Sequence, residues 1–440
     1  MQGPGDTAMN NCLILKGDIC HTPVLGEIET LENGYVISVD GICRGVFSEL
    51  PEEYRGLPVK EFPDALIIPG MSDLHTHASQ FAYRGMGMDE ELLDWLENWA
   101  FPEECKFADP AYTEKAYGLF AESMRKSATT RALIFATIHR EATLALMEKL
   151  EDTGIVSYVG KVNMNRNSPD SLNEGSTEEA VKNTELWVKE ALAKKFDHTF
   201  PIITPRFIPT CTDDLLQELG RVAREHHLPV QSHLSENPEE GEWVLELMPD
   251  ISFYGEGYEK YGLFGKDVPT VMAHCIYSNP EEVELMRKNG VFIAHCPNSN
   301  MNIRSGIAPV RKYLQKEMRI GLGTDVAGGM SLSMFRAITD TIQMSKLYWR
   351  LIDQEAKALT FAEAFYLATK GGGAFFGKVG SFEPGYAFDA VVISDRRFTT
   401  LRKLTLKQRL EQAVNLGLDL NCLIAKYAEG RECLCIPDKA

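Results

Sequence analysis

Residues 69–80, PGMSDLHTHASQ, contain two histidines one residue apart at the end of an apolar run. On an extended chain, residues i and i+2 point to the same side, so the imidazoles of His75 and His77 face one way. Two nitrogen donors in this geometry can reach one metal ion. The spacing alone is equally consistent with a hydrogen-bonded structural pair, so it has to be weighed with the rest of the chain.

The composition is that of a globular protein. The 440 residues are 44% hydrophobic and 25% charged, and this length suits a barrel of about 250 residues or more with an appended module. We find neither an apolar run of about 20 residues nor a signal sequence. Ten cysteines are scattered, without the paired spacing of a disulfide framework or a zinc ribbon. We therefore expect a soluble, cytoplasmic protein with reduced thiols and no membrane partner.

The charge argues against one class of partner. The formal net charge is -18 and the isoelectric point is about 5.1. Binding to a phosphate backbone depends on clustered lysine and arginine. A nucleic acid polymer is therefore not expected as a partner.

The middle of the chain alternates short apolar strands with longer helical patterns, which is typical of repeated βα units. Helices are predicted at 177–196 and 212–227, the second opened by Thr212 as N-cap. The strand candidates are ALIIPGMSDL, RALIFATI, SYVGKVNM, FPIITPRF, LPVQSHL, TVMAHC, VFIAHC and RIGLGTD. This pattern favours an α/β fold of the (β/α)₈ barrel type over an open doubly wound sheet.

Both ends of the chain have a different texture. Short apolar runs in 12–65 and in GYAFDAVVISD, residues 385–395, are separated by Gly, Asn and Asp, as in small antiparallel strands. We predict that these flanking pieces fold together as one small β-module. The opening segment 1–11 has no periodicity and is treated as a leader outside the fold.

Metal-competent side chains end one strand candidate after another: His75, His77, His233, His274, His295 and Asp325. In a (β/α)₈ barrel the carboxyl ends of the strands form the face where catalytic residues gather. Each histidine taken singly is more often structural, but the set predicts a metal site. We expect the solvated surface of helices or loops for the isolated histidines His21, His198, His226 and His227.

Several competing motifs are absent from the sequence. It has no C-x-x-C, which excludes the deaminase pattern with two zinc-binding cysteines, and no H-E-x-x-H, G-x-S-x-G or G-x-x-x-x-G-K-[ST]. Catalytic zinc takes histidine nitrogen and carboxylate oxygen and keeps one position open for water. The prediction is therefore a hydrolytic metal site.

Longer segments make the chain similar to the amidohydrolase superfamily. They are PGMSDLHTHASQ, QSHLSEN, MAHC, IAHCPNSN and GLGTDVAGG, and together with LLDWLENWAFPEE, FATIH, KVNMN and ITPRF they resemble the guanine deaminase family. The likeness covers nearly the whole chain, and HTHASQ, TPRF and SHLSEN are far more specific than HxH. It implies a distorted (β/α)₈ barrel at 66–378 and a β-sandwich built from both termini, 12–65 and 379–440.

The resemblance also implies a cofactor. One Zn²⁺ per subunit would be surrounded by His75, His77, His233, His274 and Asp325. The same ligand types would accept iron or manganese. His295 is expected to support the cavity without touching the ion, because the five ligands already crowd it.

Catalytic roles follow for Glu236, Asp325 and His274. In the resemblance, Asp325 accepts a hydrogen bond from the attacking water, while Glu236 passes protons to a purine ring nitrogen and to the leaving amine. The sequence alone leaves a second interpretation of Glu236 open, since SEN could begin a helix with an acidic residue.

The implied ligand is a purine base, held by His77, Gln80, Arg206, Phe207, His233, Glu236 and Asp325. Arg206 would donate to the purine O6, and the Gln80 amide would both donate and accept at the edge with N3 and N9. Phe207 would stack on the base. From TPRF alone, a salt-bridged barrel arginine and a core phenylalanine would be favoured instead. Trp95 is expected to pack in a helix that covers the pocket.

The chain departs from the family pattern in KSATTRALIFATIH. A glycine-containing GTTT is usual where Ala128, Thr129, Thr130 and Arg131 stand here. These residues lie on the second predicted barrel strand, away from the predicted ligands. We expect the departure to affect local packing rather than chemistry.

The first hypothesis is a zinc-dependent guanine deaminase that hydrolyses guanine to xanthine and ammonia in purine catabolism and, as the resemblance implies, forms a homodimer. Its enzymatic rivals are other amidohydrolases: deaminases of oxidised guanine, of thiomethyladenosine or of adenosylhomocysteine, and triazine chlorohydrolases. TPRF and HASQ speak against the nucleoside and triazine options. A third alternative is a catalytically silent barrel used for assembly, against which the retained ligands and Glu236 argue.

Overall fold

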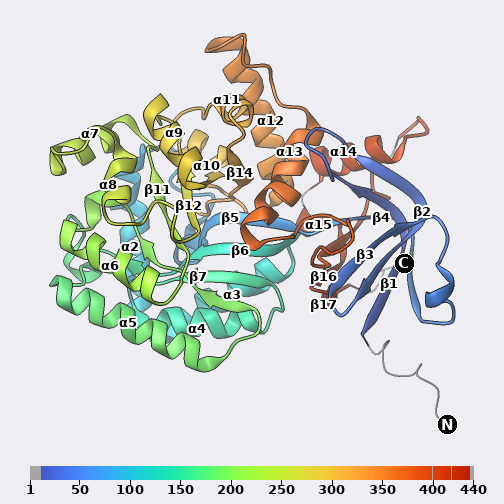
Figure 1. Cartoon of the computed structure of the whole chain (residues 1–440), viewed down its shortest axis with the longest axis horizontal. Coiled ribbons are helices and arrows are strands. Elements are labelled where there is room, and N and C mark those ends of the chain that lie inside the picture. Colours follow the sequence, from blue (N-terminus) through green and yellow to red (C-terminus); the bar gives the residue numbers. More distant parts are fainter. Residues whose placement is uncertain (1–10, 399, 418, 437–440) are drawn as a thin grey trace.

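The computed structural model describes residues 11–398, 400–417 and 419–436, and Figure 1 shows two sheets side by side. Residues 1–10, to which most of the leader prediction applies, lie outside these ranges, as do 437–440 of the predicted C-terminal segment. The larger sheet carries helices around it, and the smaller one joins the two ends of the described chain.

The larger sheet has eight strands in the order β11-β12-β13-β14-β5-β6-β7-β9, and every neighbouring pair in it is parallel. Parallel strands joined by helices are the hallmark of the α/β class, so this part of the fold prediction is confirmed. The strands are β5 (Met71–His77), β6 (Thr129–Phe135), β7 (Val156–Gly160), β9 (Thr199–Pro201), β11 (Val230–Leu234), β12 (Thr270–His274), β13 (Phe292–His295) and β14 (Arg319–Leu322).

Helix ends follow local capping chemistry. Thr212 accepts a hydrogen bond from the Leu215 N–H and begins α6, and Ser176 with Glu179 forms a capping box that begins α5, so both predicted helices are confirmed. The longer helices are α3 (Pro110–Arg125), α4 (Arg140–Glu151), α5 (Thr177–Lys194), α6 (Asp213–Glu225), α7 (Pro238–Leu247), α8 (Tyr254–Lys260), α9 (Pro280–Asn289), α12 (Met334–Leu351) and α14 (Leu406–Leu416). Shorter ones are α10 (Pro297–Asn302), α11 (Val310–Gln315), α13 (Phe361–Tyr366) and α15 (Asp419–Cys422). Within the described ranges, none of the helices combines the length and apolar character needed to cross a bilayer.

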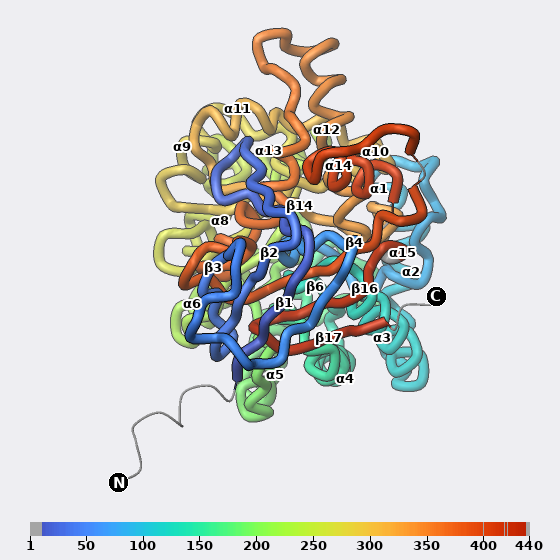
Figure 2. The backbone as a smooth tube through the Cα atoms, turned by 90° about the vertical axis from the view of Figure 1, so that its right-hand side faces the viewer, coloured from blue at the N-terminus to red at the C-terminus, as the bar shows by residue number. Residues whose placement is uncertain are grey.

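The smaller sheet joins strands from both ends of the chain, which Figure 2 shows in blue and red: the C-terminal strands lie beside the N-terminal ones and meet them where β15 pairs with β4. Its order is β17-β16-β15-β4-β1-β2-β3, a single sheet of seven strands. The predicted joint β-module is therefore confirmed, while its folding into a two-layer sandwich stays a prediction. The strands are β1 (Cys12–His21), β2 (Glu29–Val39), β3 (Ile42–Phe47), β4 (Val59–Pro69), β15 (Ala390–Ser394), β16 (Leu423–Ala428) and β17 (Arg431–Cys435).

The predicted single strand ALIIPGMSDL is wrong, because the chain changes sheets inside it. β4 pairs with β1 and β15, whereas β5 pairs with β6 and β14. The change occurs at Gly70, where an added Cβ would lie 2.2 Å from Thr130 Oγ1. Only glycine allows the backbone to approach β6 so closely.

The expectation for His21 is also wrong. This histidine ends β1 and is 7% exposed, with its ring centroid 5.8 Å from that of Phe382 and its Nε2 3.4 Å from a Glu29 carboxylate oxygen. Burial lowers its pKa. A lone histidine within an alternating strand can face the core, and the sequence carries no sign of which face is covered.

Arg131 explains the departure from the family pattern. Its guanidinium lies on β6 and donates to both carboxylate oxygens of Asp389, at 2.7 and 3.0 Å, and to Glu429 at 3.2 Å. Asp389 and Glu429 flank strands β15 and β16 of the smaller sheet. The side chains of Arg131 and Asp389 are 4% and 0% exposed. The substitution therefore joins the two sheets through a buried ion pair.

We predict that Arg131→Ala lowers the free energy of unfolding by about 3–5 kcal/mol, because it leaves the Asp389 carboxylate buried and unpaired. Denaturant unfolding measures the change. The matched control is Arg221→Ala, which breaks the half-exposed pairs with Glu185 and Glu218 and should cost less than about 1 kcal/mol. Equal losses in the two variants would contradict the account.

Candidate active site

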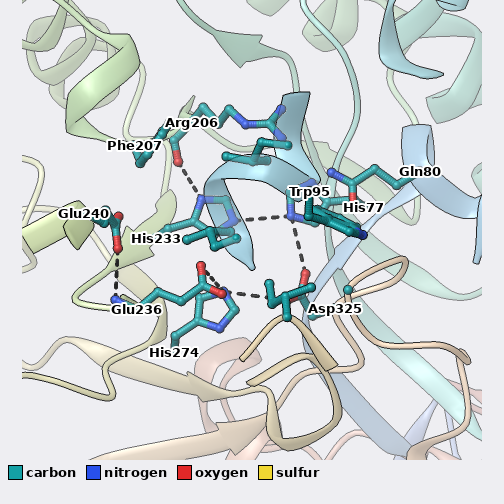
Figure 3. Close-up of a pocket in the computed structure, with 14 residues that line it drawn as sticks. His77, Gln80, Trp95, Arg206, Phe207, His233, Glu236, Glu240, His274 and Asp325 are labelled. Carbon is teal, nitrogen blue, oxygen red and sulfur yellow. Dashed lines mark hydrogen bonds and ion pairs between the residues drawn. The ribbon is translucent and has the colours of Figure 1, made fainter. Parts of the chain in front are cut away.

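Three histidines from two strands meet at the carboxyl end of the larger sheet. His75 and His77 end β5, and His233 lies near the end of β11. One ring nitrogen from each lies within 4.8 Å of the others. The Nε2 atoms of His77 and His233 are 3.3 Å apart (Figure 3).

Asp325 and His274 complete this cluster. The Asp325 carboxylate follows β14 and lies 3.1 Å from His75 Nε2 and 3.5 Å from His77 Nε2. His274 ends β12 and places its Nε2 3.6 Å from the other oxygen of Asp325. All five predicted ligands are buried and brought together, so their convergence is now an observation.

Hydrogen bonds outside the cluster fix which ring nitrogen faces inward. His233 Nδ1 donates to the Arg206 carbonyl at 2.6 Å, and His274 Nδ1 donates to Asn300 Oδ1 at 2.9 Å. Both partners are acceptors, so in the neutral rings the proton lies on Nδ1 and Nε2 carries a lone pair. This is the arrangement in which histidines bind metals.

The electrostatics keep three imidazoles of the cluster and its carboxylate in metal-binding forms, whereas Glu236 and Asp325 outweigh burial and raise the pKa of His274. Burial lowers the pKa of His75, His77 and His233, which keeps these rings neutral. Burial acts to raise the pKa of Asp325, but the facing imidazoles, His75 first, outweigh it and hold that pKa well below its ordinary value.

The donor set fits a zinc ion. Two nitrogen lone pairs 3.3 Å apart repel unless a cation lies between them, and imidazole nitrogens with one carboxylate are ligands of catalytic zinc. Cys296 forms a second cluster with His75, His274 and Asp325. Its thiol donates to the Ala294 carbonyl, and burial raises its pKa well above the ordinary value. Because only the thiolate is a good ligand, Cys296 is poorly suited to bind metal.

His295 lies near the cluster without joining it. It ends β13, is 2% exposed, and belongs to none of the candidate metal groups among the described residues. Burial lowers its pKa to about 3. Its predicted supporting role stays a prediction.

Glu236 approaches the cluster from the turn after β11. Its Oε2 lies 3.3 Å from His274 Nε2, and its Oε1 accepts a hydrogen bond from Ser305 at 3.0 Å. Burial raises its pKa to about 7, so the carboxyl can hold or release a proton near neutral pH.

The helix-start interpretation of Glu236 is wrong, because the N-cap of α7 is Asn237 and the capping carboxylate is Glu240. Glu240 accepts from the backbone N–H groups of Glu236 and Asn237, at 3.0 and 3.3 Å. Its second oxygen accepts from the Tyr254 hydroxyl at 2.8 Å. Glu240 at the helix start therefore fixes the backbone of Glu236. The side chain of Glu236 takes no part in the cap and faces the cluster.

Backbone strain gathers around the same residues. His274, Asp325 and Ser235 have positive φ angles of 73°, 47° and 47°. Non-glycine residues rarely adopt this left-handed conformation, and when they do they often belong to functional sites. Of the three, His274 and Asp325 line one cavity.

The cavity beside the cluster encloses about 420 Å³ between its lining atoms, including the part open to solvent. Metal-competent and ligand-binding candidates share its wall: His77, Gln80, Arg206, Phe207, His233, Glu236, His274 and Asp325 (Figure 3). The predicted pocket residues are therefore brought together. Leu92, Trp95 and Leu96 line the same cavity from the segment that begins with α1 (Leu92–Trp95), which confirms the expected position of Trp95.

A short two-stranded sheet positions Arg206. β8 (Val162–Asn163) pairs with β10 (Thr204–Pro205), and the Arg206 N–H donates to the Asn163 carbonyl at 3.2 Å. Arg206 is 2% exposed, and its guanidinium pairs with Glu104 at 2.6 Å. Arg206 thus lines the cavity and forms the ion pair expected of a salt-bridged arginine, while its binding of a purine stays a prediction.

Sequence reasoning missed the partners of the predicted residues, Glu104, Asn300, Ser305 and Glu240. Glu104 ends the apolar run WAFPEE, and Asn300 ends PNSN after the histidine of β13. A carboxylate at the end of an apolar segment is a signal of buried pairing. No spacing in the sequence indicates its partner.

Comparison with known proteins agrees with this geometry. The sequence profile of the amidohydrolase family matches residues 66–419. The chain belongs to the amidohydrolase family. A guanine deaminase from Dictyostelium discoideum is 36% identical, covering 95% of this chain and 97% of that protein. A guanine deaminase from Rattus norvegicus is 42% identical and covers 87% of each chain.

A solved structure is similar along its whole length. The crystal structure of guanine deaminase from C. acetobutylicum with bound guanine in the active site has a TM-score of 0.93 and 44% identity, covering 96% of this chain and 100% of that one. The resemblance to guanine deaminases and the assignment to the hydrolases are thereby confirmed. The amidohydrolase family is metal-dependent. In this chain, the cluster of histidines with Asp325 is the candidate metal site.

We predict that His233→Ala lowers the metal content of the purified protein from about one ion per chain to a small fraction of that, because it removes one of the converging lone pairs. Elemental analysis measures the metal, and His226→Ala, at an exposed position after α6, is the control. A folded wild-type protein without metal would favour the silent assembly barrel instead.

Proposed function

We propose that the protein is a zinc-dependent guanine deaminase, which hydrolyses guanine to xanthine and ammonia in purine catabolism. The observation that carries the proposal is the shared cavity. Its wall joins the metal-competent cluster and the proton-carrying Glu236 to Arg206 and Gln80, which can read the edge of a purine. The similarity to guanine deaminases, one of them solved with bound guanine, supports the same substrate.

One zinc ion per subunit would be held by His75, His77, His233, His274 and Asp325. When bound, zinc lowers the pKa of a coordinated water from 15.7 to about 7 and so supplies a nucleophile at neutral pH. Asp325 is the only carboxylate among these ligands. Since its pKa is held low, it stays ionised and accepts a hydrogen bond that aims the attacking water at C2 of the base.

Glu236 carries the protons in this proposal. A carboxyl with a pKa of about 7 can protonate a ring nitrogen of the purine, which makes C2 more electrophilic. The resulting carboxylate can take a proton from the attacking water and deliver it to the departing amine. His274, 3.3 Å from Glu236, places this carboxylate beside the metal-binding nitrogens. Ser305 holds the other oxygen and so keeps the carboxylate aimed into the cavity.

Guanine would be selected by donors at its acceptor positions. Arg206 uses one Nη to pair with Glu104 and keeps its other N–H groups for the purine O6. Adenine has no O6 and would leave the remaining N–H groups of that buried guanidinium without an acceptor, which is costly. Phe207, 5% exposed at the cavity wall, offers a ring face for stacking on the base.

The finer architecture is part of the proposal. An isolated parallel bridge between Ile203 and Val230 joins the segments at the two edges of the eight-stranded sheet, which supports a closed, distorted (β/α)₈ barrel at 66–378. The segments 12–65 and 379–440 would form the β-sandwich. We further propose a cytoplasmic homodimer, in line with the resemblance to guanine deaminases.

We predict that the purified protein converts guanine to xanthine with release of ammonia, followed by the loss of guanine absorbance. Glu236→Gln should lower kcat by about 10²–10⁴-fold, the range for a general acid–base residue, without loss of zinc. Glu239→Gln, on the exposed side of the same helix start, is the matched control. Full turnover by Glu236→Gln would remove Glu236 from its role, and turnover of 8-oxoguanine or ammeline but not guanine would favour another amidohydrolase.

A further inference from the structure

A buried carboxylate outside the catalytic cluster connects the two side chains proposed to read the purine. Glu104 ends α2 (Phe101–Glu104), and its side chain is 2% exposed. Its Oε1 accepts a hydrogen bond from Gln80 Nε2 at 2.9 Å, and its Oε2 accepts from Arg206 Nη1 at 2.6 Å. Gln80 and Arg206 come from different βα units. Glu104 contacts both side chains and therefore links the two units at the cavity.

We propose that Glu104 is a positioning residue for substrate selection: it sets the direction of the Gln80 amide and holds the Arg206 guanidinium at the cavity wall. The inference rests on the proposed function, because it concerns how the base is recognised. Glu104 itself does not line the cavity. It acts through the two side chains that do.

The Gln80 amide can face only one way in this setting. A carboxylate only accepts hydrogen bonds, so Gln80 must turn its Nε2 toward Glu104. Its Oε1 accepts from the Ala327 N–H at 3.1 Å, and a backbone N–H only donates. One N–H of the amide is then left for a ligand. Gln80 therefore presents a donor to the cavity, which matches an acceptor on the edge of the base, and its expected use as an acceptor at N9–H is disfavoured.

The guanidinium is fixed from the same helix. The Arg206 side chain pairs with Glu104 and lies over the Phe101 ring, 5.1 Å from its centroid. Both partners belong to α2. The backbone of Arg206 is held separately, by Asn163 and His233. The direction of the free guanidinium N–H groups thus depends on α2, whereas the position of the main chain does not.

The charge of Glu104 also determines which ligand the cavity accepts. An unpaired guanidinium in a buried cavity favours an anion, because a buried charge is stable only when it is compensated. Glu104 supplies that compensation inside the protein. A neutral base can then bind through hydrogen bonds to O6 and to an acceptor on its edge without bringing a charge of its own.

The residues that cover the cavity and the residues that orient Gln80 and Arg206 lie on one continuous segment. Leu92, Trp95 and Leu96 of the segment that precedes α2 line the cavity. The helix that continues this segment carries Phe101 and Glu104. The groups that cover the base and the groups that orient its hydrogen-bond donors are held by the same stretch of about one dozen residues.

The test is Glu104→Gln in the zinc-loaded full-length protein, with Glu103→Gln as the matched control. Glu103 lies on the same helix and is 7% exposed, but it pairs with Tyr112 and Lys106 outside the cavity. The probes are guanine as substrate and 2,6-diaminopurine as inhibitor. The latter carries an amino donor where guanine has the O6 acceptor.

In Glu104→Gln we expect the KM for guanine to rise about 10- to 100-fold, the range for a lost charge-assisted hydrogen bond, with a smaller change in kcat and an unchanged zinc content. The preference for guanine over 2,6-diaminopurine should fall by at least about tenfold, whereas Glu103→Gln should stay within about twofold of wild type in both. Glu104→Asp keeps the charge and should recover part of the preference; it serves as the test if Glu104→Gln does not fold.

Two results would overturn the inference while leaving guanine deamination intact. One is a KM and a preference within twofold of wild type in Glu104→Gln. The other is the same loss in Glu103→Gln as in Glu104→Gln, which would assign the effect to the packing of α2. Failure of the wild-type protein to turn over guanine would instead contradict the proposed function itself, so the two failures are distinguishable.

Discussion

The structure depends on the cost of burying several imidazoles and a carboxylate at one point without water. The cluster is stable there because hydrogen bonds hold the outward nitrogens of two of its imidazoles and because its inward atoms converge. Arg206 and Asn300 fix the outward nitrogens of His233 and His274. The inward lone pairs, with the carboxylate of Asp325, then form a candidate site for a cation. The strained turns, the covering segment and the polar wall of the cavity are arranged around this place.

Much of the fold could be predicted because periodicity and capping are local. The helices that begin at Thr212 and at Ser176 were recognisable from their N-caps, and parallel strands followed from the alternation with helices. The change from one sheet to the other at Gly70 could not be predicted, because its cause is the close approach of Thr130, which is distant along the chain. The prediction that His21 is exposed is wrong for a similar reason, because the residue that covers it, Phe382, lies near the other end of the chain.

The site divides in the same way. The histidines and Asp325 could be predicted because they end successive strands of one sheet, and topology alone brings such ends together. Their roles came from the resemblance to a family rather than from spacing. Neither the strand topology nor the resemblance to a family indicated Glu104, because its partners are separated from it by 24 and 102 positions. Only a three-dimensional structure reveals that a carboxylate joins two side chains at such separations.

X-ray absorption at the zinc edge of the purified protein tests the central claim most directly. If the imidazoles and Asp325 converge on one ion, the spectrum will contain only nitrogen and oxygen neighbours at about 2.0–2.2 Å. A sulfur neighbour at about 2.3 Å would mean that Cys296 replaces part of the predicted set. Such a result would contradict the account, and so would a spectrum with no ordered shell of protein neighbours around the zinc.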